Sequence, residues 1–83
     1  MTIYHKNGTI ITDQYDSIEA AVKAGADLAN ANLVKAYLAD ADLRGANLAN
    51  ANLMNVNVTG ADLTGADLTG VNLTLGNRLV ALV

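Results

Sequence analysis

The sequence predicts an all-β solenoid, in which one chain coils and stacks on itself. Ten consecutive five-residue units of the form A-[DN]-L-x-x run without insertion from Ala26 to Leu75. The first and third positions of each unit are mostly apolar and flank a polar second position, which is the alternation of a β-strand. The fourth and fifth positions are rich in Asn, Asp and Gly, which are the residues that turns require.

A period of five residues excludes the ordinary secondary structures. On an α-helix each successive leucine would advance by about 140°, so the leucines would spread around the whole surface. On a straight strand five is an odd step, so alternate leucines would point to opposite faces. A chain that runs extended for about three residues and then bends returns every Ala and Leu to a common interior. The pattern therefore indicates a coil.

The segment before the repeats, residues 1–25, is predicted to begin with a β-hairpin. Residues 2–6 and 9–12 are rich in β-prone side chains, and Asn7-Gly8 between them is a strong hairpin signal. A hairpin here would lie at the first coil, where a solenoid exposes an open core and unpaired backbone.

A short helix is predicted to follow the hairpin. Either Asp16 or Ser17 can serve as its N-cap, with Glu19 as the glutamate of a capping box. Gly25 ends the helix at the usual C′ position. We expect the hairpin and this helix together to form an N-terminal cap over the first coil.

The repeated A-[DN]-L-x-x units resemble the pentapeptide-repeat family over residues 26–75. The resemblance implies a right-handed quadrilateral parallel β-helix, with four units in each coil and one unit on each side. It also implies that the central leucine and the small residue two places before it fill the interior, while the other three positions face solvent. Tyr37, at an outward position, is a minor departure from the pattern.

A coil of four units places residues twenty apart in contact at the strand spacing of about 4.8 Å. One interior position from each unit then stacks into ladders along the solenoid. The predicted core ladder comprises Leu28, Leu33, Leu38, Leu43, Leu48, Leu53, Val58, Leu63, Leu68 and Leu73.

Composition excludes several classes of function. The 83 residues carry a net charge of −3 and include no Cys and one His, which excludes disulfides, thiolate chemistry and a multi-histidine metal centre. Eight acids against five bases argue against direct nucleic-acid binding, and no apolar run is long enough to span a membrane. We expect a cytoplasmic, non-enzymatic protein with no catalytic residue, metal or cofactor.

Two surfaces are candidates for binding. Val34 and Met54 are expected to stack on the second side of the coil, with Tyr37 on the next side, as an exposed apolar partner face. Asp42 and Asp62 are expected to stack on another side, with Asp40 at the adjoining corner, as an acidic face.

Two functions remain open. The first is a rigid module whose surfaces bind another protein. The alternative comes from the resemblance, because some pentapeptide-repeat proteins are acidic rods that mimic duplex DNA and occupy DNA gyrase. On that hypothesis the chain would inhibit a topoisomerase, a nuclease or another enzyme complex that acts on nucleic acid.

The C-terminal segment, residues 76–83, ends in five consecutive apolar residues. Such a β-prone segment without charge pairs readily with another edge if it is exposed. We expect a homodimer through this end, in which a second copy covers the last coil. The alternative is a monomer whose tail folds back over its own core. The expected dimer contacts are Leu79, Val80, Leu82 and Val83.

Overall fold

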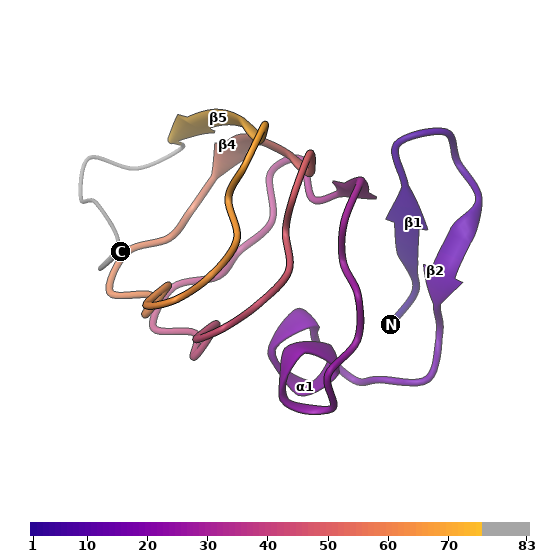
Figure 1. The fold of residues 1–83 in the computed structure, drawn as a ribbon, viewed down its shortest axis with the longest axis horizontal. Coiled ribbons are helices and arrows are strands. Elements are labelled where there is room, and N and C mark those ends of the chain that lie inside the picture. The colour runs from indigo at the N-terminus through magenta and orange to yellow at the C-terminus, as the bar shows by residue number, and fades with distance from the viewer. Residues whose placement is uncertain (76–83) are drawn as a thin grey trace.

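The computed structural model describes residues 1–75. Its elements are β1 (Ile3–His5), β2 (Ile10–Thr12), α1 (Ile18–Lys23), β3 (Ala31–Asn32), β4 (Asn52–Val56) and β5 (Asn72–Leu75). The strands form one open sheet in the order β2-β1-β3-β4-β5. Strand β1 is antiparallel to both β2 and β3, whereas β3, β4 and β5 are parallel. The β1–β2 hairpin lies at one end of the stacked coils and β5 lies at the other (Figure 1).

Residues twenty apart pair along the whole repeat, so the chain is a β-solenoid. Asn32 pairs with Asn52 and Asn52 with Asn72, and parallel bridges join other such residues, including Tyr37 and Asn57. The Leu38 N–H donates to the Asn57 carbonyl at 2.7 Å. Because hydrogen bonds of this kind recur on successive sides, each coil is a template for the next.

A tight turn closes most units, and its geometry explains the residues at the fifth position. The Ala31 N–H donates to the Leu28 carbonyl three residues earlier at 3.1 Å, and the same bond recurs along the repeat. The residue before this donor has a positive φ, such as 63° at Asn30 and 71° at Gly45. A type II turn requires a positive φ at that place, which Gly and Asn adopt most easily.

The core fills the inside of the coils. The first eight members of the predicted ladder, from Leu28 to Leu63, are buried, and so are the alanines at 31, 41, 46, 51 and 61. The last two members differ from the expectation. Leu68 is half-buried and Leu73 is 48% exposed. The reason is their position in the last described coil, over which no later coil of residues 1–75 stacks.

The hairpin contains the expected Asn7-Gly8 pair in its loop. The Gly8 N–H donates to the His5 carbonyl at 2.9 Å, and the His5 N–H donates to the Thr9 carbonyl at 2.7 Å. Gly8 has a φ of 90°, so the loop is a turn followed by a left-handed residue. On its other edge β1 pairs with β3, which joins the hairpin to the first coil.

Helix α1 begins at Ser17 as its N-cap, whose side chain accepts from the Ala20 N–H at 3.0 Å. Glu19 is therefore one place too early for the capping box that the sequence suggested. Its carboxylate instead accepts from the Asp42 N–H at 2.5 Å, 23 residues away. Gly25 and the residue after it return N–H bonds to the last turn, as in a Schellman motif. Ile18 of the helix is buried in the common core, and no helix of the described chain is long and apolar enough to cross a membrane.

Candidate functional site

The Asp and Asn side chains at the second position of the repeat serve the fold itself. In eight units an Oδ1 atom accepts the backbone N–H two residues later, as Asp27 does from Ala29 at 2.9 Å. The residues that accept in this way are Asp27, Asn32, Asp42, Asn47, Asn52, Asn57, Asp62 and Asp67. Such local bonds explain why the repeat needs Asp or Asn at this position, without any chemical role.

The expected acidic face is partly neutralised by an arginine. Asp42 and Asp62 pair across adjacent coils. The Arg44 guanidinium donates to both oxygens of Asp42, with Nε at 2.8 Å from Oδ1 and Nη2 at 2.9 Å from Oδ2. The same Nε lies 4.0 Å from Oδ2 of Asp62. Asp40 lies at the corner of the preceding unit, with a φ of 60°.

These contacts keep both carboxylates of the acidic face ionised. Hydrogen bonds from Arg44 lower the pKa of Asp42 to about 2. Bonds from the hydroxyl and N–H of Thr64 lower the pKa of Asp62. Within residues 1–75 no three His, Asp or Glu side chains are arranged to hold a metal ion. The face can therefore offer fixed negative charge, although Arg44 reduces it.

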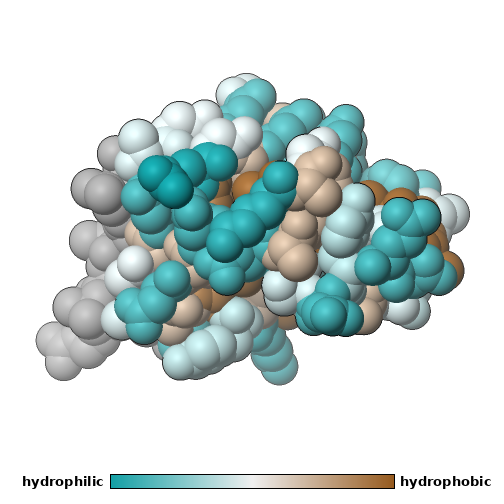
Figure 2. All heavy atoms as spheres, turned by 90° about the horizontal axis from the view of Figure 1, so that it is seen from below, coloured by the Kyte–Doolittle hydropathy of each residue, from teal (hydrophilic) through white to brown (hydrophobic). Residues whose placement is uncertain are grey.

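The expected partner face contains one strongly exposed aromatic residue. Tyr37 is 77% exposed and Val34 is 40% exposed. Met54 is partly buried and lies on the coil next to Val34, since the Lys35 N–H donates to the Met54 carbonyl at 2.8 Å. Met54 also accepts a contact from the Thr74 hydroxyl to its sulfur at 3.4 Å. The face seen in Figure 2 is by comparison mostly polar, with apolar atoms in narrow strips.

Tyr37 also breaks the hydrogen-bond pattern of the repeat. It occupies a second position, but its side chain has no oxygen near the backbone that could accept the Ala39 N–H. In residues 1–75 that N–H makes no hydrogen bond, in contrast to the equivalent groups of the eight units described above. An exposed aromatic side chain has thus replaced a residue that the fold favours.

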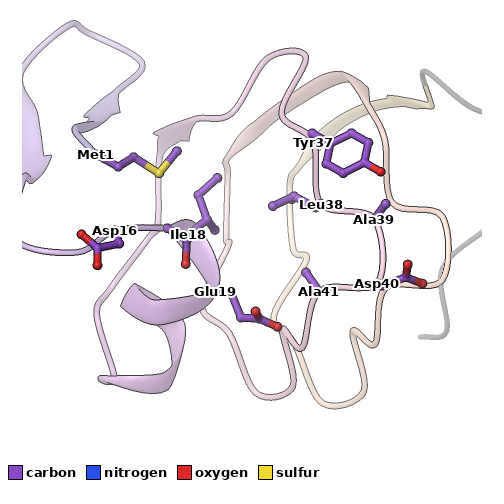
Figure 3. Close-up of a pocket in the computed structure, with 10 residues that line it drawn as sticks. Met1, Asp16, Ile18, Glu19, Tyr37, Leu38, Ala39, Asp40 and Ala41 are labelled. Atoms are coloured by element: carbon purple, nitrogen blue, oxygen red, sulfur yellow. The ribbon is translucent and has the colours of Figure 1, made fainter.

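A pocket of about 320 Å³ lies beside Tyr37, and sequence reasoning did not find it. It is lined by Met1, residues 16–19 and residues 37–41, so it joins segments that are distant in the chain (Figure 3). Three of its lining residues are acids, and none is Lys, Arg or His. The departure at Tyr37 was the one sequence signal that pointed to this part of the molecule.

The expected dimer contacts Leu79, Val80, Leu82 and Val83 lie outside the described residues. Homodimer formation therefore stays a prediction from the sequence.

Comparison with known proteins gives one match. A family model described as pentapeptide repeats matches residues 24–60 and 36–74, with eight copies of the repeat. No curated protein matches the chain, and no solved structure does.

Proposed function

Because the chain belongs to the pentapeptide-repeat family, whose model matches more than half of it, we propose that it is a non-enzymatic module that binds another protein. In this proposal the coil is right-handed and four-sided, as the family implies, and the N-terminal hairpin and helix cap it. The module acts in the cytoplasm and needs no cofactor. Fold alone does not decide function, so the proposal depends on a surface feature.

That feature is Tyr37. A residue that gives up a backbone hydrogen bond of the repeat and exposes 77% of an aromatic side chain lowers stability without improving the core. Tyr is also enriched among the residues that dominate binding energy at protein interfaces. Val34 and Met54 on the adjoining side extend the apolar area around it.

The test exchanges this residue for the one that the repeat favours. Tyr37→Asn should restore the bond to the Ala39 N–H and raise the free energy of unfolding by about 1 kcal/mol. It should also reduce capture of the partner from a lysate of the source cells, and so should Met54→Lys. Asp27→Asn, which changes a second position on another side and keeps its bond to Ala29, should leave capture unchanged. Full capture by both Tyr37→Asn and Met54→Lys would contradict the proposal.

The DNA-mimic alternative is decided in the same assay. Asp42→Asn with Asp62→Asn removes two charges from the acidic face, and Asp27→Asn with Asp67→Asn removes two from another side. A mimic requires the first pair to reduce capture and the second pair to have little effect. It also requires added salt to weaken the complex, since exposed charges are screened. The ion pair between Arg44 and Asp42 leads us to prefer the protein-binding module.

Self-association through the C-terminal segment is a further part of the proposal, based on the sequence alone. Leu79→Glu with Leu82→Glu should halve the mass measured by light scattering and keep the circular-dichroism spectrum. A wild-type protein that is monomeric at high micromolar concentration would contradict it.

A further inference from the structure

The first coil leaves one edge of its third side open. In the second coil the corresponding edge is paired, because the Asn57 N–H donates to Ala36 at 2.9 Å and the Asn57 carbonyl accepts from Leu38 at 2.7 Å. The Thr59 carbonyl likewise accepts from the Asp40 N–H at 2.7 Å. Twenty residues earlier, the equivalent groups are the N–H and carbonyl of Tyr37 and the carbonyl of Ala39. None of these three groups has a hydrogen bond within residues 1–75.

The chain itself covers the two flanking sides at this edge. On the second side β1 pairs with β3, and the Lys6 N–H donates to the Asn30 carbonyl at 2.9 Å. On the fourth side the Glu19 carboxylate accepts from the Asp42 N–H. The third side lies between these two and borders the pocket of Figure 3. The missing strand would therefore lie in that pocket.

The pocket has the size and lining of a peptide site. Its volume of about 320 Å³ falls within the range of ligand pockets, about 300–1,000 Å³. Ile18 and Leu38 form an apolar floor, and Tyr37 lies at its border. Asp16 and Asp40 lie at opposite ends of the pocket in Figure 3, and no lining side chain is cationic. Charge complementarity therefore favours basic residues at the two ends of an occupant.

We propose that this pocket binds an extended segment of a partner protein, which adds a β-strand in the place of a coil before the first. The inference rests on the proposed function and names the kind of partner segment that the module recognises. The segment has a small aliphatic residue at its centre and basic residues at its ends. Backbone pairing of this kind supplies affinity, and alternate side chains supply specificity.

The register of the second coil predicts the bonds for a probe, the acetylated and amidated hexapeptide KANVAK. Its second residue accepts the Tyr37 N–H, its fourth N–H donates to the Tyr37 carbonyl, and its sixth N–H donates to the Ala39 carbonyl. Its valine then lies over Leu38 and its two lysines approach the acidic ends of the pocket. The N–H groups of its third and fifth residues point away from the protein.

The experiment measures amide signals and hydrogen exchange of the whole chain by NMR with this peptide. Saturating peptide should slow exchange of the Tyr37 N–H at least tenfold and shift the amides of residues 37–41. N-methylation at the fourth residue of the peptide should weaken binding at least tenfold, whereas N-methylation at the third should change it less than threefold. Absence of protection at Tyr37, or equal binding of both methylated peptides, would overturn the inference.

Protein variants separate the backbone from the side chain. Tyr37→Pro removes the N–H that the peptide needs and should weaken peptide binding at least tenfold, whereas Tyr37→Ala keeps this N–H and should weaken binding less. Circular dichroism checks that both variants are folded. If Tyr37→Pro loses the peptide but still captures the cellular partner, the pocket is not that partner's site, and the proposed function stands without it.

Discussion

Leu48→Ala is the substitution that tests the stacking of coils most directly. Leu48 is 1% exposed and lies between Leu28 and Leu68 in the twenty-residue register. Replacing a buried leucine by alanine removes its transfer free energy and leaves a cavity, which together lower stability by about 2.7–5.0 kcal/mol. At about 0.05–0.15 kcal/mol per residue, a chain of this length has a total stability of about 4–12 kcal/mol. The variant should therefore lose a large share of the stability of the fold.

The assay is thermal and urea unfolding followed by circular dichroism. Since about 1 kcal/mol shifts the midpoint by about 4–8 °C in a domain of this size, Leu48→Ala should melt at least about 10 °C below wild type. Leu73→Ala is the matched control, because Leu73 is 48% exposed and its truncation should lower stability by less than about 1.5 kcal/mol. Equal midpoints for Leu48→Ala and wild type would refute the twenty-residue register.

Two further predictions concern a corner of the coil and the acidic face. Gly60 and Gly65 have φ angles of 70° and 73°, so alanine at either position should destabilise by about 1–2 kcal/mol in urea unfolding. Gly60→Ala should cost more, because its new Cβ would meet the Asp40 carboxylate, and Asp40→Ala should remove the difference; equal effects of the two glycine substitutions without it would refute this. The folded-state pKa of Asp42 lies at about 2, below its ordinary value of 3.8, so its contribution to stability is complete above about pH 4 and is lost as the pH falls toward 2. Arg44→Gln should raise that pKa in a carbon-13 NMR titration, and an unchanged value would contradict the assigned cause.

The repeat was predictable because each unit encodes its own geometry. Alternation of Ala, Asp or Asn, and Leu defines the extended part, and Asn or Gly at the fifth position defines the turn, as the positive φ of Asn30 and Gly45 shows. These are local properties, so they can be read from five residues. The turn at Gly8 was predictable for the same reason.

The parts that were missed depend on contacts between distant segments. Glu19 fits a capping box by spacing, yet Ser17 became the cap and Glu19 reached Asp42, which no local pattern encodes. The pocket beside Tyr37 needs the position of α1 relative to the first coil, and nothing in the sequence gives that position. The exposure of Leu73 depends on where stacking stops, whereas the repeat looks alike in every unit.

The interchangeable sides of the coil have a consequence for how such a chain can evolve. Because Asn32, Asn52 and Asn72 pair across successive coils, duplication of twenty residues would lengthen the stack and leave every surface in its place. Duplication of one five-residue unit would instead rotate everything after it by a quarter of the period. A single short insertion in the gene could thus bring two distant surface features onto one face while the interior stays intact.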